Sequence, residues 1–256
     1  MPSSLLSSKR VLVTGASRGI GAAIAERCAA EGAELLLTAR SADKLREVAE
    51  RCRAAGAPLC ACLPCDLADP SSIDRLAAEV LQKHPEGVDV LVNNAGTGSG
   101  NQDILTGEAE AVVGDPDAWE AMLYTNTLGP MRLTRLLAPA MAQRGGGLIV
   151  NTGSLAGTFA SASSAPYCAS KWGIRGWVLS TYEELRRHGI RTMVIEPGFV
   201  ATDMVLHLGK LLPELCIQPS DIAEAALLPL RLGSNAVPLE LVMKARRGAD
   251  LAKKCV

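Results

Sequence analysis

The strongest constraint on the fold is an alternation of short apolar runs with longer amphipathic stretches along the chain. Between the runs lie segments such as ADKLREVAERCRAAG, whose apolar residues recur with helical spacing. The short runs read RVLVTG, AELLLTA, PLCACLP, VDVLVNN, GGLIVNTG, RTMVIEPG and LELVMKA. Strands that are apolar on both faces and separated by helices indicate a parallel sheet covered on both sides. Because crossovers between parallel strands are right-handed, the pattern predicts an α/β fold with a doubly wound, seven-stranded parallel sheet.

The domain organisation follows from length and from the absence of internal boundaries. A chain of 256 residues suits one large α/β domain or two small ones. No repeat, low-complexity tract or linker interrupts the alternation, which favours one domain over residues 1–256. We expect residues 1–9 to form a flexible N-terminal arm and residues 245–256 a C-terminal tail. Asp69-Pro70 and Asp115-Pro116 each have the sequence of a helix N-cap followed by proline.

The charge balance limits the kinds of partner that the chain can attract. Hydrophobic residues make up 48% and charged residues 21%, and the formal net charge is −1. Such a chain has no net field for nucleic acid or an anionic membrane surface, so we expect neither partner. Its apolar runs are too short to span a bilayer. The leader MPSSLLSSKR has no long apolar stretch, which makes a secretory signal improbable, and we expect a cytoplasmic protein.

Three of the eight cysteines form a local cluster that could suggest a metal site. Cys60, Cys62 and Cys65 lie together, but no second cluster accompanies them and His84 is the nearest histidine. Cys60 and Cys62 have the spacing of one strand face, where cysteine acts as a small apolar residue. We therefore predict no metal site, and reduced thiols rather than a disulfide framework.

Two segments break the regular alternation, and both follow the carboxyl end of a predicted strand. Residues 97–115 form a polar, glycine-bearing loop, and residues 203–219 form a predicted substrate lid. Open α/β sheets bind ligands at this edge, so we expect the two segments to form the substrate pocket. His207 could contact a polar substrate group, although a surface position is the simpler interpretation. An apolar wall of the pocket, or simply the core of the lid, is expected from Met204, Val205, Leu206, Leu208 and Leu211.

A glycine-rich turn, TGASRGIG at residues 14–21, follows the first predicted strand and opens a helix. This arrangement presents backbone N–H groups and the positive end of the helix to a pyrophosphate. The glycine spacing is GxxxGxG rather than the GxGxxG usually quoted for dinucleotide folds. The alternative is a tight strand-to-helix turn that uses glycine for backbone reasons only.

Tyr167 and Lys171 lie four residues apart in APYCASKWGIRGW, so a helix would place both side chains on one face. Both are weak proton donors, with ordinary pKa values of about 10 and about 10.4. A nearby cation favours the phenolate form of a tyrosine, which would make the pair useful in proton transfer. The alternative is a surface tyrosine that packs over a lysine stem.

Taken together, TGASRGIG, NNAG at 93–96, YCASK at 167–171 and EPG at 196–198 resemble the motifs of the short-chain dehydrogenase/reductase family. The four motifs occur in the order and at the spacing of that family, and they extend over nearly the whole chain. The resemblance implies a single Rossmann-type domain. It also implies an enzyme that moves a hydride between a nicotinamide cofactor and a carbonyl or alcohol group.

The resemblance implies a catalytic role for four residues. Tyr167 would protonate the carbonyl oxygen as the hydride arrives, while Lys171 would hold the nicotinamide ribose and favour tyrosinate. Ser154 would orient the substrate oxygen, although it could instead satisfy a loop at the end of a strand. Asn126 would hold a water that leads to Lys171. Lowering the pKa of a tyrosine from about 10 to about 7 takes about 4 kcal/mol, which requires a closed, cofactor-filled site.

The end of the second strand, LLLTARS, predicts the choice of cofactor. An NAD enzyme has an acid there, whereas this chain has Arg40, with Arg18 in the glycine turn nearby. Two guanidinium groups can hold a 2′-phosphate, so we predict NADP(H) over NAD(H), with a solvated Arg40 as the alternative. The cofactor-binding set, completed by the resemblance, is Gly15, Ser17, Arg18, Gly19, Ile20, Gly21, Arg40, Asp66, Leu67, Asn94, Ala95, Gly96, Tyr167, Lys171, Pro197, Gly198, Val200 and Thr202.

Three functions remain open from the sequence. The favoured one is an NADP(H)-dependent carbonyl reductase or alcohol dehydrogenase that acts on a small-molecule substrate. A 3-oxoacyl reductase of fatty-acid type is less favoured, because the ending NAVPLELVMKARRGADLAKKCV lacks the glycine-rich final strand of such enzymes. That ending resembles more weakly the hydroxy-acid and serine-type dehydrogenases of the family. A non-catalytic nucleotide-binding scaffold is disfavoured, because it would not need all four catalytic residues.

The helix expected from about residue 165 to 188 suggests an assembly. It carries Trp172, Trp177 and Tyr182, in a chain with only 3% aromatic residues. Related enzymes pair this helix with its two-fold mate, so we expect a homodimer or homotetramer. The alternative is that these aromatic residues pack only against their own sheet.

Overall fold

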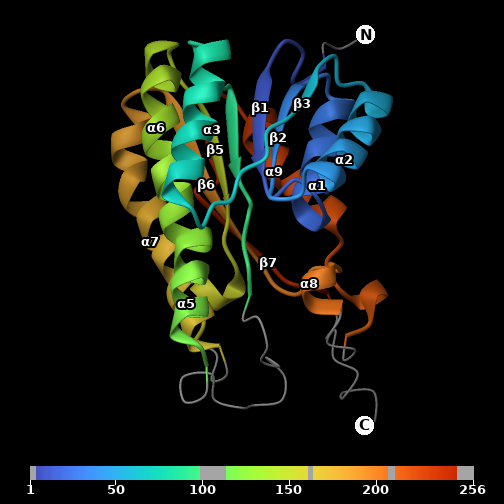
Figure 1. The fold of residues 1–256 in the computed structure, drawn as a ribbon, viewed down its shortest axis with the longest axis vertical. Coiled ribbons are helices and arrows are strands. Elements are labelled where there is room, and N and C mark those ends of the chain that lie inside the picture. The colour runs from blue at the N-terminus through green and yellow to red at the C-terminus, as the bar shows by residue number, and fades with distance from the viewer. Residues whose placement is uncertain (1–3, 99–113, 161–163, 207–210, 247–256) are drawn as a thin grey trace.

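The computed structural model describes residues 4–98, 114–160, 164–206 and 211–246, and these form a seven-stranded sheet (Figure 1). The strand order is β3-β2-β1-β4-β5-β6-β7, and every neighbouring pair is parallel. The predicted seven-stranded parallel sheet is confirmed. The strands are β1 Arg10–Thr14, β2 Glu34–Thr38, β3 Cys60–Cys62, β4 Val90–Asn93, β5 Gly147–Thr152, β6 Ile190–Pro197 and β7 Glu240–Met243.

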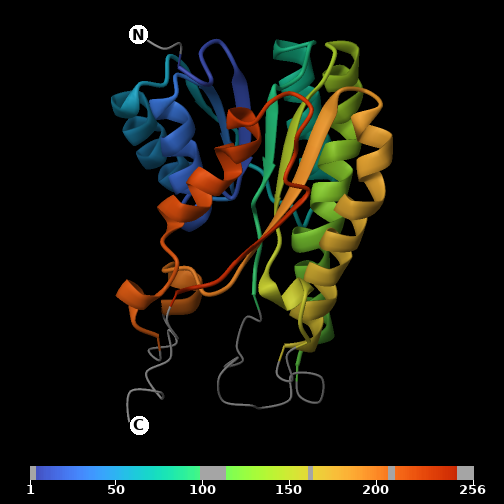
Figure 2. The ribbon, with the colours of Figure 1, turned by 180° about the vertical axis from the view of Figure 1, so that it is seen from behind.

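Helices cover both faces of this sheet, as the alternation predicts (Figures 1 and 2). One face carries α1 (Gly19–Ala30), α2 (Ala42–Ala55) and α9 (Pro219–Arg231), which pack on one another. The other face carries α3 (Pro70–Lys83), α6 (Gly129–Gln143) and α7 (Ala165–Arg186), with α5 (Pro116–Leu123) beside α7. Shorter elements are the π-helix η1 Tyr124–Leu128, the 3₁₀ turns η2 Leu155–Gly157 and η3 Pro213–Leu215, and the four-residue helix α8 Asp203–Leu206.

Side chains of the central strands alternate between two separate cores. On β1, Val11 and Val13 are buried against α1, α2 and α9, whereas Leu12 is buried against α3 and α6. The neighbouring strand β2 repeats this division, because its residues are in register with those of β1. Both faces of each central strand are therefore apolar, which is the property that predicts a sheet covered on both sides.

Two predicted helix starts occur as the sequence indicates. The carboxylate of Asp69 accepts the backbone N–H of Ser71 at the start of α3, and that of Asp115 accepts the N–H of Asp117 at the start of α5. In both helices proline occupies the first turn, where it has no hydrogen bond to lose.

The N-terminal segment differs from the predicted flexible arm in the part that the structure describes. Leu6 is 1% exposed and belongs to the core beneath α1. The backbone N–H groups of Leu5 and Leu6 donate to Glu31, at 3.1 Å to its carboxylate and 3.0 Å to its carbonyl oxygen. The burial of the Leu6 side chain and the hydrogen bonds to Glu31 stabilise this segment by more than the conformational entropy that its ordering costs. Residues 1–3 and residues 247–256 of the predicted tail lie outside the described residues.

The described cysteines act as apolar or partly buried thiols. Cys60 is buried and Cys62 partly buried in the core that α1 and α2 cover, while Cys65 belongs to the opposite core. All seven cysteines of the described segments are free thiols. Within those segments, no three histidine, cysteine or acidic side chains gather as metal ligands would.

None of the helices in the described segments combines the length and the apolar character that a membrane crossing requires.

Candidate active site

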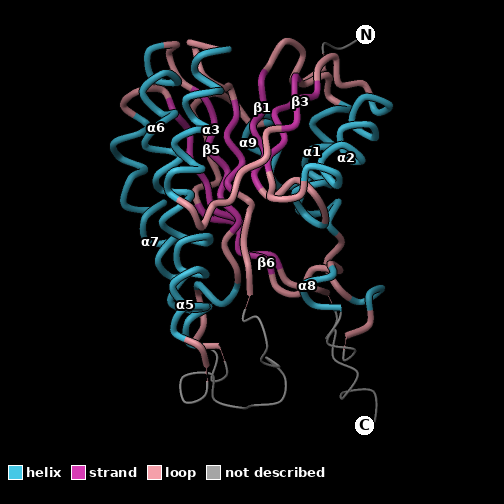
Figure 3. Tube along the Cα trace, in the orientation of Figure 1, coloured by secondary structure: helices cyan, strands magenta, loops and turns pink. Residues whose placement is uncertain are grey.

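Most of the predicted site residues gather at the carboxyl edge of the sheet. Strands β1, β4, β5 and β6 are neighbours, so the segments that follow them meet at this edge. Beyond the same edge lie α5 and α8 (Figure 3). This is the edge where an open parallel sheet binds its ligands.

The glycine turn has the shape of a phosphate cradle. Gly15 has φ of +66°, and a Cβ atom there would lie 2.7 Å from the Cα atom of Ala95. Only glycine allows this close approach of two backbones. At the start of α1, the Arg18 side chain makes no capping hydrogen bond, and the first turn contains no acidic residue. The start of the helix therefore suits a pyrophosphate, as the sequence predicts.

Thr14 ties the glycine turn to the NNAG segment. Its buried hydroxyl oxygen accepts the backbone N–H groups of Asn94 at 2.9 Å and Ala95 at 3.0 Å. The Asn94 amide donates in turn to the Thr14 carbonyl oxygen at 3.0 Å. Sequence reasoning treated Asn94, Ala95 and Gly96 as a cofactor surface and missed Thr14. The threonine of TGASRGIG, at the end of an apolar strand, was the signal that could have identified it.

The two predicted contacts with a 2′-phosphate differ in their surroundings. Arg40 is exposed at the end of β2, and the stretch Thr38–Ser41 contains no acid, so a phosphate fits there. Arg18 instead forms an exposed ion pair with Asp203 of α8, with 3.4 Å between Nη1 and Oδ2. This pairing was not predicted, because the two residues are 185 positions apart.

The segment after β3 is divided between a surface role and a core role. The carboxylate of Asp66 accepts the backbone N–H of Ala68 at 2.9 Å, which shapes a local turn. Leu67 is buried in the core with α3 and α6, so its side chain does not contribute to the surface of a cofactor site. Only its backbone can flank an adenine as the resemblance implies.

The segment after β6 is held against the glycine turn. The N–H of Gly198 donates to the carbonyl oxygen of Met243 at 2.8 Å, and Val200 pairs with Ile217. A Cβ atom on Gly19 would lie 3.2 Å from the Thr202 methyl group. Thr202 and the start of α1 therefore line the same space, as the cofactor assignment requires.

Asn126 lies in the π-helix η1, between α5 and α6. Its amide accepts the N–H of Thr97 at 2.8 Å and donates to the carbonyl oxygen of Thr97 at 2.8 Å. It also donates to the hydroxyl of Ser170 at 3.0 Å. A Cβ atom on Gly96 would lie 3.3 Å from Asn126 Oδ1 and 3.6 Å from Lys171 Nζ, so Asn126 and Lys171 flank one glycine. A π turn at this position is typical of a functional site.

Lys171 is only 4% exposed, and its ammonium group donates to the Thr152 carbonyl oxygen at 3.0 Å. Nζ lies 5.7 Å from the centre of the Tyr167 ring, which agrees with one helix face for both residues. Burial lowers the pKa of Lys171 to about 8, against the opposing charge of Glu196. The lysine can therefore exchange a proton near neutral pH.

The environment of Tyr167 differs from the simple expectation of a tyrosinate stabilised by Lys171. Burial raises the pKa of Tyr167, and a hydrogen bond with Ser154 opposes that effect only in part. The nearby Glu196 also raises the pKa of Tyr167. The protein alone therefore keeps the phenol protonated, and a lowered pKa requires a further positive charge beside the ring.

Ser154 begins the η2 turn directly after β5. Its hydroxyl oxygen accepts the N–H of Ala156 at 3.2 Å, and its own backbone N–H donates to Glu196 Oε2 at 2.7 Å. The interaction with Tyr167 brings together two of the groups that the resemblance makes catalytic. Ser154 also satisfies a loop through Ala156, as the alternative interpretation expected.

Glu196 is a second residue of this site, after Thr14, to which the sequence analysis gave no role. It is 0% exposed, and burial raises the pKa of its carboxyl group to about 7. The signal was present in RTMVIEPG, an otherwise apolar strand that carries a carboxylate near its end. A buried carboxylate is costly, so it indicates either a partner or a function.

Part of the predicted lid belongs to a small hydrophobic cluster that is separate from the two main cores. Leu211 and Cys216 are buried together, with Val205 and Phe199 packed against them. Met204 is exposed, and its sulfur would lie 3.9 Å from a Cβ atom on Gly98. Met204 can therefore face a substrate, whereas Leu211 and Val205 stabilise the lid. His207, Leu208 and residues 99–113 lie outside the described residues.

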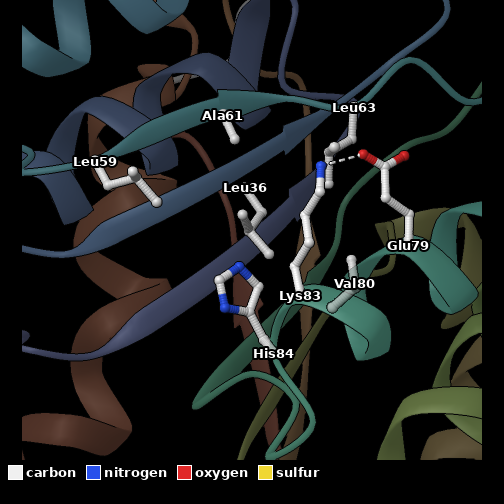
Figure 4. A pocket seen from close by; sticks show the side chains of 8 residues that line it. All are labelled: Leu36, Leu59, Ala61, Leu63, Glu79, Val80, Lys83 and His84. Carbon is white, nitrogen blue, oxygen red and sulfur yellow. Dashed lines mark hydrogen bonds and ion pairs between the residues drawn. The ribbon is translucent and has the colours of Figure 1, made fainter.

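A hollow beside β3 contains none of the predicted site residues (Figure 4). It lies between β3 and the end of α3, where Lys83 pairs with Glu79 at 2.6 Å. Its lining is mostly apolar and consists of Leu36, Leu59, Ala61, Leu63, Glu79, Val80, Lys83 and His84.

The doubly wound sheet, the glycine cradle and the tyrosine beside a buried lysine define a dinucleotide-dependent oxidoreductase of the Rossmann type. The family model for short chain dehydrogenases matches residues 9–210. The chain belongs to this family, whose members act on alcohol and carbonyl groups with a nicotinamide cofactor.

Three known proteins illustrate the similarity. The chain is 36% identical over 196 residues to the 3-oxoacyl-[acyl-carrier-protein] reductase of Salmonella typhimurium. The matched region covers 77% of this chain and 75% of the reductase. A metagenomic short-chain oxidoreductase solved with NADP is 36% identical, with a TM-score of 0.81 over 96% of this chain and 100% of the other. The L-sorbose reductase of Gluconobacter frateurii, solved with NADPH and L-sorbose, is 26% identical, with a TM-score of 0.84 and coverages of 95% and 97%.

Proposed function

We propose that this protein is an NADP(H)-dependent carbonyl reductase or alcohol dehydrogenase that uses Tyr167 as its general acid and base. The observation that carries the proposal is the convergence of Tyr167, Ser154 and Lys171 beside a glycine cradle at one edge of the sheet. A non-catalytic scaffold would have no use for a buried lysine beside a tyrosine, because the burial of an ammonium group is costly.

When it is bound, the nicotinamide cofactor supplies or accepts the hydride. Ser154 and Tyr167 donate hydrogen bonds to the substrate carbonyl oxygen, which places the carbonyl carbon for attack. Tyr167 then gives its proton to that oxygen, so the alcohol forms and the phenolate remains. The Lys171 ammonium stabilises the phenolate, and its pKa of about 8 suits it to restoring the proton. Asn126 makes two hydrogen bonds with Thr97, and these fix the backbone beside Lys171.

The catalytic assignment is tested by Tyr167→Phe, with Tyr182→Phe, near the C-terminal end of α7, as the matched control. Tyr167→Phe should remove nearly all turnover while NADPH binding stays within a few fold, because only the hydroxyl is lost. A panel of aldehydes, ketones, β-keto esters and hydroxy acids, with NADPH or NADP, provides the substrate. A Tyr167→Phe variant that retains near-normal turnover with a competent substrate would contradict the proposed proton donor.

The choice of NADP(H) is supported by Arg40 and by the missing acid at the end of β2. It is also supported by the NADP and NADPH bound in the two similar structures. One lost charge-assisted contact is worth about 1.5–3 kcal/mol, or roughly ten- to hundred-fold in affinity. Arg40→Asp should therefore shift the kcat/KM ratio strongly from NADPH toward NADH, and added salt should weaken the native preference.

Arg46→Asp is the control for this experiment, since it makes the same change of charge at an exposed site on α2 that pairs with Asp43. It should leave the cofactor ratio nearly unchanged. A native protein that prefers NADH, or an Arg40→Asp variant with an unchanged ratio, would remove Arg40 from the proposed phosphate site.

A second candidate function is a 3-oxoacyl reductase, favoured by the 36% identity to the Salmonella enzyme. A β-ketoacyl thioester distinguishes this candidate from the first. If such a thioester is reduced with a kcat/KM at least tenfold above that of simple ketones and β-keto esters, the 3-oxoacyl function is preferred. If no carbonyl compound or alcohol of the panel turns over, both enzymatic proposals are contradicted.

The assembly is proposed to be a homodimer or homotetramer that pairs through α7 and α5. Trp172 is 46% exposed, and Leu123 and Leu128 on the adjoining α5–η1 segment are also exposed. Trp177 by contrast packs on Ile174 and the sheet of its own chain, which fits the alternative for that residue.

The cytoplasmic location stays a prediction. The absence of nucleic-acid or membrane partners also stays a prediction, based on the formal net charge of −1. Cell fractionation with an antibody to the native chain would test the location.

A further inference from the structure

Among the described residues of the active-site edge, the least exposed charged side chain belongs to Glu196, at 0%, and none of the four proposed catalytic roles uses it. It lies near the end of β6, and its carboxylate Oε2 accepts the backbone N–H of Ser154 at 2.7 Å. Strands β5 and β6 bring the two residues together, because the N–H of Gly153 donates to the carbonyl oxygen of Ile195 at 2.7 Å. The carboxylate therefore holds the turn that presents the Ser154 hydroxyl.

Two glycines make room for this carboxylate. A Cβ atom on Gly153 would lie 2.5 Å from Oε2, and one on Gly157 would lie 3.3 Å from the same oxygen. Both glycines have ordinary backbone angles, so a turn conformation does not require them. Their lack of side chains instead lets a buried carboxylate reach the backbone of the serine turn.

The charges around Glu196 come from two further elements. Lys171 and Arg175 face it from α7, with 4.0 Å between Arg175 Nε and Glu196 Oε1, and Glu240 faces it from β7. Arg175 also forms a hydrogen bond with Glu240. Glu196 Oε1 is buried and has no hydrogen-bond partner among the described residues. The Ser154 N–H is therefore the one hydrogen bond that the described residues offer this carboxylate.

We infer that Glu196 is a positioning residue that sets the Ser154 hydroxyl against Tyr167 by holding the backbone amide of Ser154. This inference rests on the proposed roles of Ser154 and Tyr167. A misplacement of about 1 Å in a catalytic group can cost on the order of 10² in rate, so the hydrogen bond from the Ser154 N–H to Glu196 should affect turnover. An ionised carboxylate accepts an N–H more strongly than a protonated one does. Because the pKa of Glu196 is raised to about 7, the hold weakens as the pH falls through neutrality.

The first experiment compares Glu196→Ala, Glu196→Gln, Ser154→Ala and the Glu196→Ala/Ser154→Ala double variant. It uses NADPH with ethyl acetoacetate or the best substrate of the panel. Glu196→Ala should lower kcat roughly ten- to hundred-fold and leave the NADPH Kd, measured by fluorescence, within about threefold. Glu196→Gln keeps an oxygen acceptor and should retain kcat within about threefold at pH 8.

The double variant distinguishes a positioning role from a general loss of stability. If Glu196 acts through Ser154, Glu196→Ala should add little to the loss already caused by Ser154→Ala. In the kcat–pH profile, the native protein should decline by up to about threefold, toward the level of Glu196→Gln, as the pH falls through 7, and Glu196→Gln should lack this step. The control is Glu31→Ala, because Glu31 also accepts a backbone N–H, at the opposite end of the sheet. It should leave kcat unchanged.

The outcomes separate this inference from the proposed function. Full turnover in Ser154→Ala would show that the role proposed for Ser154 is wrong. A collapse in Ser154→Ala, with native turnover in a folded Glu196→Ala, would overturn the inference alone. Additive losses in the double variant would overturn it as well. If Glu196→Ala does not fold, the Glu196→Gln pH profile decides, and a profile identical to that of the native protein contradicts the inference.

Discussion

Replacing Glu196 by glutamine should stabilise the protein above neutral pH, although it removes a charge from the active site. Glutamine has nearly the same shape and keeps a carbonyl oxygen for the Ser154 N–H, which is 2.7 Å from Oε2 in the native protein. What the substitution removes is the cost of ionising a carboxyl group that is 0% exposed.

The magnitude follows from the two pKa values. The pKa of Glu196 rises from the ordinary 4.5 to about 7 in the folded protein, chiefly through burial. Between these values the folded chain binds more protons than the unfolded chain, so stability falls as the pH rises through this window. Since one pKa unit corresponds to about 1.4 kcal/mol, the full cost above pH 7 is about 3 kcal/mol. Below pH 4.5 both states are protonated and the cost disappears.

The assay is urea unfolding followed by tryptophan fluorescence at pH 4.5, 6, 7 and 8, at one protein concentration. The Glu196→Gln variant should match the native protein at pH 4.5 and exceed it by up to about 3 kcal/mol at pH 8, with equal m-values. Glu31→Gln is the control with the opposite sign. The pKa of Glu31 is lowered by the hydrogen bond from the Leu5 N–H and by the Arg27 side chain, so this substitution should destabilise the protein at high pH. An advantage of Glu196→Gln that does not vary with pH would refute the buried, late-ionising carboxyl group.

Four further variants test the backbone, the π turn and the assembly. Gly15→Ala should destabilise the chain by at least about 1–2 kcal/mol in urea unfolding, because φ is +66°. Gly176→Ala should instead stabilise it by about 1 kcal/mol, since a Cβ atom there meets nothing within 4 Å. Asn126→Ala should destabilise it by about 1–3 kcal/mol and lower kcat, because Thr97 loses both partners; an unchanged kcat would remove Asn126 from the proposed site. Trp172→Glu should give a monomer in light scattering at micromolar concentration, and a native protein that is already monomeric would contradict the α5–α7 interface.

The sheet was predictable because its information is local and repeated. Val11, Leu12 and Val13 are apolar on both sides of their strand, and such strands between amphipathic segments admit few topologies. The helix starts at Asp69 and Asp115 were equally local, since a cap and a proline act within one turn.

The parts of the site that escaped prediction depend on contacts between distant segments. The Arg18–Asp203 ion pair and the Glu196–Ser154 hydrogen bond join residues that no local pattern relates. The sequence also did not predict the pKa shifts of Lys171 and Tyr167. Their direction depends on how far the folded chain removes each side chain from water. The predicted flexible arm over residues 1–9 did not anticipate the buried position of Leu6, because that position depends on a contact with α1 and Glu31, which are distant in sequence.

The π turn at Tyr124–Leu128 gives this stretch of the chain an unusual sensitivity to length. A π turn contains one residue more than the α-helical turn that it replaces. Deleting a single residue there would yield a more regular helix. A measurement of total helix content would not detect the change. The deletion would leave α5 and α6 close to their native phase, because an α-helical turn takes the place of the π turn, but it would shift the residues inside the turn. Asn126 would then point away from Thr97, so a deletion that makes the helix more regular would dismantle one side of the active site.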